Sequence, residues 1–266
     1  MGYEMIRFCV LLTVSVLLAG ACTMKRTRDL PEHYFGLEEV PVARAIFNGE
    51  GRELKRLLKQ GSADISRPGK EGCTFLQYAL KLKEYKMMEI LLEQGADPNV
   101  ISPRTRIRIG KLSEGTTYDE LPLETSCHSI YSIKYMQLLV KYGAKINDNR
   151  VVIPLDRAIS GDQRNKINYL LSKGADVNLA YEDTGGTVLL SAAILSNWEL
   201  VELFLNYGAD PFHSDKRGID LYYYIQQRIN RKGTPEGARK VWKLIRRLEK
   251  QGMQFDFSKA KIQRED

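Results

Sequence analysis

The chain has 266 residues, of which 43% are hydrophobic and 27% charged. This composition is ordinary for a globular protein with a sizeable core, and the length allows one long domain or two short ones. The formal net charge of +7 is compatible with a nucleic acid, anionic lipid or an acidic protein as partner, and the location of the protein decides among them.

The N-terminal segment has the pattern of an export signal. Residues 8–21 carry no charge, and Arg7 precedes them. A run of this length is too short for a bilayer span, which needs about 20 apolar residues, but it suits the apolar region of a signal peptide. Met5 is an alternative start to Met1, because the leader then lacks the acidic Glu4. We expect residues 1–21 to be the signal peptide.

The signal ends in Leu17-Leu18-Ala19-Gly20-Ala21-Cys22, which resembles a bacterial lipobox. The commonest lipobox has Leu three places before the cysteine, where this chain has Ala19. The resemblance implies lipidation of Cys22, with residues 22–37 as a tether. Because Thr23 is not Asp, it also implies an outer-membrane lipoprotein facing the periplasm. An uncleaved anchor and a plain secretory signal are the alternatives.

Internal repetition dominates the rest of the chain. Two apolar residues, two further residues and a glycine recur five times, and a sixth copy is degenerate. The glycines are 34, 48, 31, 34 and 44 residues apart, so a unit of about 33 residues needs two insertions. Apolar residues at helical spacing precede each glycine, which is typical of a helix end. These glycines are Gly61, Gly95, Gly143, Gly174, Gly208 and Gly252.

The repeated segments closely resemble the ankyrin repeat. Leu91–Asn99 and Leu170–Asn178 both read Leu-Leu-x-x-Gly-Ala-Asp-x-Asn, and Thr74–Ala79 is similar to the opening of that repeat. The resemblance covers residues 38–252 and implies an all-α ankyrin-repeat solenoid of about six helix-pair units. Stacked inner helices need a small residue at their contact. That position falls on Ala45, Ala79, Ser126, Ala158 and Ala192, and on Tyr224 in the last unit.

The first insertion, at about residues 100–116, separates units two and three. Within it Arg104, Arg106 and Arg108 alternate with other residues, which predicts a protruding β-hairpin with three arginines on one strand face. We expect these arginines to meet carboxylates on a partner or phosphates on lipid. Pairing with acidic residues of the same hairpin is the alternative.

The C-terminal part holds the second insertion, at about residues 230–237, whose Pro and Gly content predicts a loop. The final helix, expected over Ala238–Gln251, has one apolar and one basic face. The basic face is either a solvated face of an end cap or a contact for anionic lipid. Residues 253–266 are expected to be a loose tail.

No catalytic or metal-binding pattern occurs in the sequence. The three histidines are far apart, and no nucleophile, phosphate-loop or dinucleotide motif is present. We therefore expect no enzyme, no cofactor and no small-molecule substrate. The register places Cys73 in a loop tip and Cys127 in the following inner helix, which favours two separate thiols over a disulfide.

The ankyrin resemblance implies that a protein partner docks on the concave face, formed by loop tips and exposed inner-helix positions. Exposed aromatic, apolar and arginine side chains are the usual anchors of such interfaces, although ordinary packing is the alternative for each one. Together with the hairpin arginines, the candidate contact residues are Phe47, Lys70, Lys81, Leu82, Tyr118, His128, Arg150, Tyr181, Ile194, Leu195 and Lys216.

These features predict an envelope-located module that binds, and inhibits or sequesters, another protein. A sharper hypothesis is an immunity protein that neutralises a toxin from neighbouring bacteria. A structural scaffold or adaptor for envelope proteins or anionic lipid is the alternative. Nucleic acid is not expected as a partner outside the cytoplasm.

Overall fold

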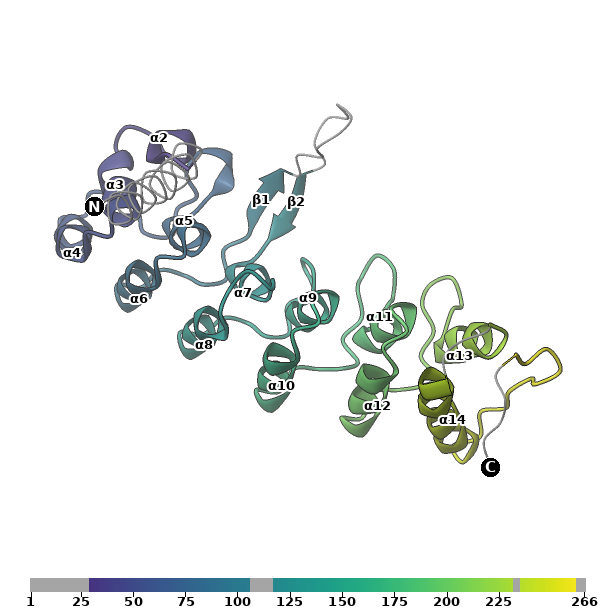
Figure 1. Ribbon diagram of the computed structural model, residues 1–266. Helices are drawn as coiled ribbons and strands as arrows, with labels where there is room; N and C mark the ends of the chain where they lie inside the picture. Colours follow the sequence, from purple (N-terminus) through teal and green to yellow (C-terminus); the bar gives the residue numbers. More distant parts are fainter. Residues whose placement is uncertain (1–28, 106–116, 232–234, 262–266) are drawn as a thin grey trace, which may run out of the picture. The chain divides into compact units, whose positions relative to one another are not determined.

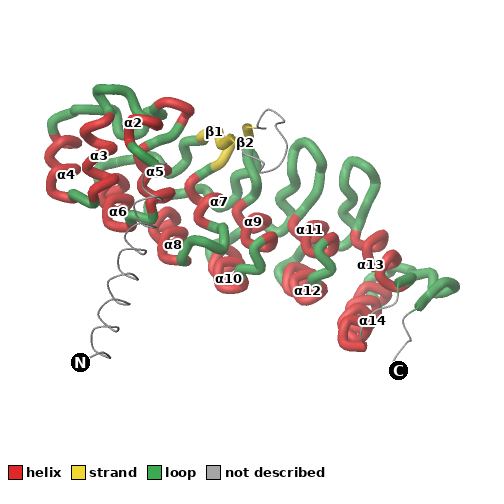
Figure 2. Tube along the Cα trace, turned by 45° about the horizontal axis from the view of Figure 1, so that its top comes forward, coloured by secondary structure: helices red, strands yellow, loops and turns green. Residues whose placement is uncertain are grey.

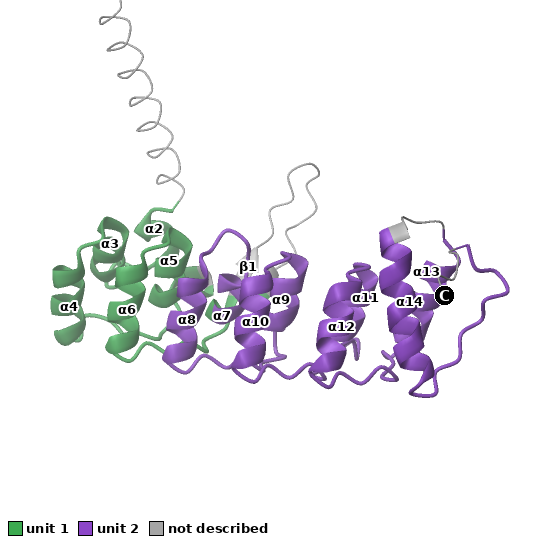
Figure 3. Ribbon diagram, turned by 60° about the horizontal axis from the view of Figure 1, so that its bottom comes forward, with its two compact units in different colours: residues 1–122 green, residues 123–266 purple. Residues whose placement is uncertain are grey.

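The computed structural model describes residues 29–105, 117–231 and 235–261. This part of the chain is mostly helical and forms six helix pairs, each an inner helix followed by an outer one (Figure 1). The predicted fold class is therefore confirmed. The signal segment and Cys22 lie outside the described residues. Two compact units are distinguished, residues 1–122 and residues 123–266 (Figure 3).

The N-terminal unit contains the first two helix pairs and a two-stranded sheet. Within it the inner helices α3 and α5 pack together, as do the outer helices α4 and α6. A capping box begins α5, because the Thr74 hydroxyl accepts from the Gln77 N–H and the Gln77 side chain accepts from the Thr74 N–H. The elements are α2 (Pro31–Tyr34), α3 (Val40–Asn48), α4 (Gly51–Lys59), a 3₁₀ turn η1 (Lys70–Gly72), α5 (Phe75–Leu82), α6 (Tyr85–Glu93), β1 (Ser102–Thr105) and β2 (Thr117–Glu120).

The predicted hairpin between the second and third helix pairs is confirmed. Strands β1 and β2 are antiparallel, with Ser102 opposite Glu120 and Thr105 opposite Thr117. The Gln77 side chain fastens its base, since Nε2 donates to the Val100 carbonyl at 3.3 Å and to the Glu120 carbonyl at 3.4 Å. The residues that join the strands, 106–116, lie outside the described part of the chain.

The residues just before the first helix pair differ from the expected tether. Phe35 is fully buried, stacked on Phe75 at a ring separation of 4.8 Å and edge-on to Tyr78 at 5.3 Å. Gly69 permits this approach, because a Cβ there would lie 2.6 Å from the Tyr34 carbonyl oxygen. The aromatic burial explains why α2 and Phe35 form a cap on α5 rather than a free segment.

The C-terminal unit contains the remaining four helix pairs, joined by the long loops that Figure 2 shows in green. Inner helix α11 packs between α9 and α13, and outer helix α12 packs on α14. The elements are α7 (Pro122–Ser126), α8 (Ile133–Lys141), α9 (Pro154–Ser160), α10 (Arg164–Ser172), α11 (Val188–Ile194), α12 (Trp198–Asn206), α13 (Leu221–Ile229) and α14 (Pro235–Glu249).

Asparagine side chains link successive repeats in this unit. Asn147 donates to the Gly174 carbonyl at 3.0 Å and accepts from the Asp176 N–H at 2.9 Å. Asn178 makes the same two bonds one repeat later, to Gly208 at 3.0 Å and from Asp210 at 2.8 Å. Each amide thus satisfies backbone groups of the next repeat, which accounts for the asparagine at this position.

The small residues predicted at the contacts between inner helices are all buried. Ala79, Ser126, Ala158 and Ala192 have no exposed surface, and Ala45 is 2% exposed. Close approach of these helices therefore leaves no room for a larger side chain. Within the described ranges, no helix combines the length and the apolar character that a membrane crossing requires.

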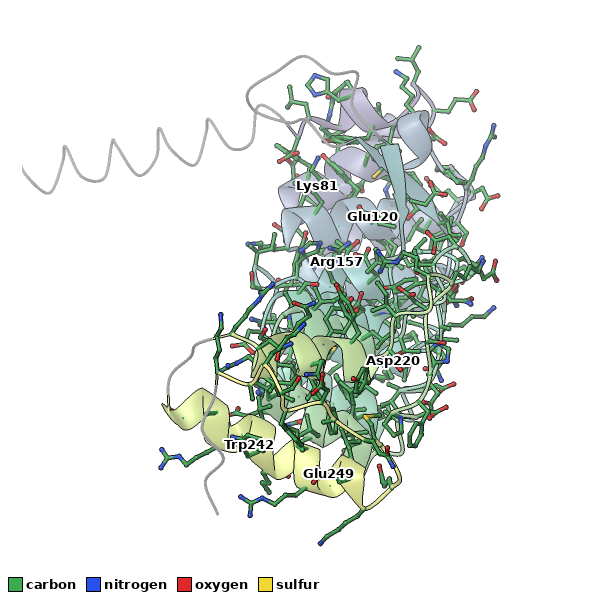
Figure 4. All side chains as sticks on the ribbon, turned by 90° about the vertical axis from the view of Figure 1, so that its right-hand side faces the viewer. Lys81, Glu120, Arg157, Asp220, Trp242 and Glu249 are labelled. Atoms are coloured by element: carbon green, nitrogen blue, oxygen red, sulfur yellow. The ribbon has the colours of Figure 1, made fainter. Side chains whose placement is uncertain are left out.

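The C-terminal residues pack on the last helix pair instead of forming a loose tail. Phe255 stacks on Tyr222 at 5.5 Å, and Phe257 lies 5.2 Å from the Trp242 ring, which Figure 4 labels on α14. The Lys261 N–H also donates to the Ile229 carbonyl at 2.9 Å. No seventh pair covers these aromatic side chains within the described residues, so the segment up to residue 261 covers them.

Replacing Ala158 with Arg is expected to destabilise the C-terminal unit by roughly 3 kcal/mol or more, through overpacking and a buried charge. Urea unfolding of wild type and variant measures the loss. Ser160→Arg is the control, since Ser160 lies exposed on the same helix. Equal stability of Ala158→Arg and wild type would show that this inner-helix contact is misassigned.

Candidate protein-interaction surface

Two loop tips of the C-terminal unit are organised by buried aspartates. Asp148 accepts from the Arg150 guanidinium at 2.9 Å and 2.5 Å, and this hydrogen bond is the main cause that lowers the pKa of the Asp148 carboxyl. Asp215 repeats the arrangement with Arg217 at 2.7 Å. Its pKa is lowered chiefly by the Ile219 N–H, 3.0 Å away. Arg150, predicted as a partner contact, therefore also shapes its own loop.

Tyr181 and Lys216 are likewise engaged within the unit. The Tyr181 hydroxyl donates to Asp156 Oδ2 at 2.7 Å and accepts from the Ile153 N–H at 3.2 Å, and burial raises its pKa. Lys216 Nζ donates to the Glu182 carbonyl and so ties two neighbouring loops together. Tyr181 was expected to be exposed but is half-buried, because its hydroxyl joins a loop to the start of α9.

The backbone of His128 belongs to a buried polar contact. Lys166 on α10 is 1% exposed, and its Nζ donates to the carbonyls of Ser126 at 2.9 Å and His128 at 2.6 Å. These carbonyls lie at the end of the short helix α7, where a cation is favourable. Burial lowers the pKa of the Lys166 amino group.

Two further charged or nucleophilic groups are buried beside this contact. Arg157, labelled in Figure 4, forms an ion pair with Glu124, and the two side chains are only 13% and 1% exposed. Burial raises the pKa of the Cys127 thiol to about 12, so the reactive thiolate is disfavoured. Cys73 and Cys127 are both thiols in the structure, as the register predicted.

In the N-terminal unit, the two candidate lysines contact the segment around α2. Lys81 Nζ lies 2.9 Å from Asp29 Oδ1 and 4.3 Å from the centre of the Tyr34 ring, and it bonds the Tyr34 hydroxyl. Lys70 Nζ donates to the Glu32 carbonyl at 3.5 Å. The chain's own N-terminal segment thus takes up part of the hydrogen-bonding capacity of both residues.

The other candidate contact residues of this unit lie on α3, on α5 and in the hairpin. Phe47 and Leu82, expected to be exposed, are half-buried by the packing of α3 and α5. Arg104 lies opposite Tyr118 in the hairpin register. Arg106 and Arg108 fall outside the described residues, so the predicted arginine stripe stays a prediction.

An exposed apolar surface lies at the end of α11 and on α13. Ile194 is 56% and Leu195 55% exposed, as the register predicted, and Tyr223 on α13 is 44% exposed. Ile194 and Tyr223 line a cavity of about 240 Å³ together with Arg228 and Arg231. We call these five residues the Ile194 surface.

A second, more polar cavity of about 510 Å³ adjoins the first, and both are lined by Ser196 and Arg228. Leu195 also lines it. Several of its charges are paired: Glu199 accepts from Arg164 at 3.0 Å and from Lys240 at 2.7 Å. Lys240 also reaches Glu236 at 2.8 Å.

The sequence analysis missed Tyr223, Arg228 and Arg231. None of the predicted contact residues lies on this helix, whose Gln226 side chain donates to the Asp256 carbonyl of the C-terminal segment at 2.6 Å. The run Tyr222–Tyr224 could have predicted an exposed aromatic residue here, because three consecutive aromatic residues on a short helix cannot all face the core.

The basic face of the final helix makes ion pairs and a hydrogen bond with α12. Lys243 pairs with Glu202 on α12 at 2.7 Å, as Lys240 does with Glu199, and Arg247 donates to the Leu205 carbonyl at 2.9 Å. These contacts favour the end-cap interpretation over lipid binding. The part of the chain that the structure describes holds no cluster of three His, Cys, Asp or Glu side chains suited to a metal ion.

Comparison with known proteins agrees with this architecture. The family model of the ankyrin repeat matches residues 71–103. The chain is 27% identical over 232 residues to "Ankyrin repeat and KH domain-containing protein mask-1" of Caenorhabditis elegans, covering 80% of this chain and 8% of that protein. It is 36% identical over 75 residues to the human "2-5A-dependent ribonuclease", covering 28% and 10% of the two chains.

A solved structure shows the same fold. The ankyrin repeat domain of Bcl-3, described as a member of the IkappaB protein family, superimposes with a TM-score of 0.60 at 17% identity, over 80% of this chain and 86% of that one. These comparisons support the ankyrin-repeat family. The ankyrin-repeat fold is in general a non-enzymatic scaffold for protein–protein interaction, although one relative is named a ribonuclease. The chain spans a tenth or less of the two sequence relatives named here.

Replacing Lys166 with Met is expected to cost about 2–4 kcal/mol of unfolding free energy, because two carbonyls at the end of α7 lose their buried donor. Urea unfolding measures the change. Lys173→Met, at an exposed position just after the same helix, should leave stability nearly unchanged. Similar results for both variants would mean that the contact adds nothing to stability.

Proposed function

We propose that the chain is a protein-binding module of a bacterial cell envelope, held at the membrane by a lipid on Cys22, that sequesters or inhibits a partner protein. The observation that carries the binding role is the Ile194 surface, which exposes two aliphatic side chains and a tyrosine on the inner helices of an ankyrin-repeat fold. Isolated exposed apolar residues are common, but a cluster beside a cavity and two arginines is typical of an interface.

The envelope location rests on the sequence of residues 8–22. The uncharged run ends in small residues and a cysteine, as in a lipobox, and the preceding Arg7 supplies the positive start. Cys127 is compatible with an oxidising compartment, since it is fully buried and burial raises the pKa of its thiol, which disfavours the reactive thiolate.

The sharper form of this proposal is an immunity protein. A module that neutralises a toxin must cover a functional cleft tightly and stoichiometrically, and exposed aliphatic side chains next to arginines suit that task. Affinity capture from envelope and from culture fluid distinguishes it from a scaffold. Tight one-to-one binding of a single toxin supports immunity, and weak association with several resident proteins supports a scaffold.

The double variant Ile194→Asp, Leu195→Asp is expected to weaken binding of the captured partner at least about tenfold, because the apolar anchors become charged. Isothermal titration gives the affinities. Tyr207→Asp is the matched control: Tyr207 is 52% exposed at the end of outer helix α12 and lines neither cavity. If the control weakens binding and the double variant does not, the Ile194 surface is not the binding site.

Replacing Cys22 with Ala is expected to release the protein from the membrane fraction, because one cysteine carries the proposed anchor. Cys73→Ala is the control that removes a thiol elsewhere in the chain. Fractionation after a salt wash, with mass spectrometry of the N-terminal peptide, reads out the anchor. A Cys22→Ala protein that stays in the membrane fraction would overturn the lipid assignment.

A further inference from the structure

Arg228 and Arg231 line the smaller cavity without an acidic partner among the residues that the structure describes. Other arginines of this unit form ion pairs, among them Arg157 with Glu124 and Arg164 with Glu199. Within the described residues, no ion pair joins Arg228 or Arg231 to a carboxylate. Arg228 Nη1 donates instead to the Arg231 carbonyl at 3.2 Å. A guanidinium has five N–H donors, so most remain available for a ligand.

The acidic groups of the adjoining cavity do not compensate these charges. Glu199 lies between Arg164 and Lys240, and Glu236 is paired with Lys240. Asp162, which also lines that cavity, lies 3.8 Å from Arg164. Each of these carboxylates thus faces a cation, whereas the smaller cavity is lined by Arg228 and Arg231 and by no acidic residue. A ligand that brings its own carboxylates would complete the bidentate pairing that arginine favours.

The apolar half of the surface lies directly beside this charge. Ile194, Tyr223, Arg228 and Arg231 line one cavity of about 240 Å³. Small-molecule sites usually measure about 300–1,000 Å³, so this cavity suits one large side chain of a peptide better than a separate ligand. Tyr223 meets Tyr224 edge-on at 5.4 Å, which holds its ring at the cavity.

We infer that the Ile194 surface recognises an acidic peptide segment in which a large aliphatic or aromatic side chain is flanked by carboxylates. The apolar side chain enters the cavity between Ile194 and Tyr223, and the carboxylates pair with Arg228 and Arg231. This inference rests on the proposed binding function and specifies the chemistry of the partner. A polyanion such as nucleic acid binds through many phosphates, whereas this surface joins only two unpaired arginines to apolar side chains.

The test uses three fluorescent synthetic peptides and the full chain. One carries two leucines flanked by glutamates, the second has lysine in place of glutamate, and the third has serine in place of leucine. Fluorescence anisotropy should show the first binding at least about tenfold more tightly than the others, the effect expected of desolvated charge pairs and apolar anchors. The double variant Arg228→Glu, Arg231→Glu should reverse the preference between glutamate and lysine peptides. Arg239→Glu, exposed on α14 and lining neither cavity, is the control and should change nothing.

Equal binding of the glutamate and lysine peptides, or no effect of the double variant at an unchanged melting temperature, overturns the inference. The inference is also overturned if the protein binds phosphatidylglycerol vesicles or an oligonucleotide through these arginines but binds none of the peptides. The proposed function fails separately. The captured partner could bind the double variant Arg228→Glu, Arg231→Glu at wild-type affinity but no longer bind Ile194→Asp, Leu195→Asp. That result supports the proposed binding function and overturns only the inference that the partner segment is acidic.

Discussion

The inability of a single helix pair to bury its own apolar face is the constraint on which this structure depends. Neighbouring inner helices satisfy it by close contact at Ala158 and Ala192, where no side-chain surface remains exposed. Among the described residues no further pair follows the last one, and aromatic residues of the C-terminal segment cover it, while an aromatic residue before the first pair covers the inner helix of the second. Phe35 covers α5, and Phe255 and Phe257 cover the last pair. Both coverings therefore follow from the same need for burial.

Much of the fold could be predicted from the sequence because the same local pattern, weak in any one repeat, recurs along the chain. The glycines, the small inner-helix residues and the hairpin alternation all have a fixed period. The coverings at Phe35 and Phe255 have none: each occurs once, in a segment without helical spacing, so only the three-dimensional packing assigns them. Only the aromatic residues of these two segments indicated that the segments would pack on the helices.

The interaction surface could be predicted only in part for a related reason. A repeat register gives the position of a side chain, so Ile194 and Leu195 were placed correctly as exposed. It does not give the contacts that a side chain makes within its own chain, and these engage Tyr181 and Lys81. Tyr223 and Arg228 lie on α13 of the last pair, on which the C-terminal segment also packs.

The contact between Lys166 and the end of α7 bears on the order in which the chain folds. Its two hydrogen bonds join residues 40 and 38 positions apart, and α7 itself has only five residues. A helix this short is unstable alone. A chain that emerges from its N-terminus reaches α7 before the lysine whose side chain binds the end of that helix. The contact thus couples the stability of the third pair to that of the fourth.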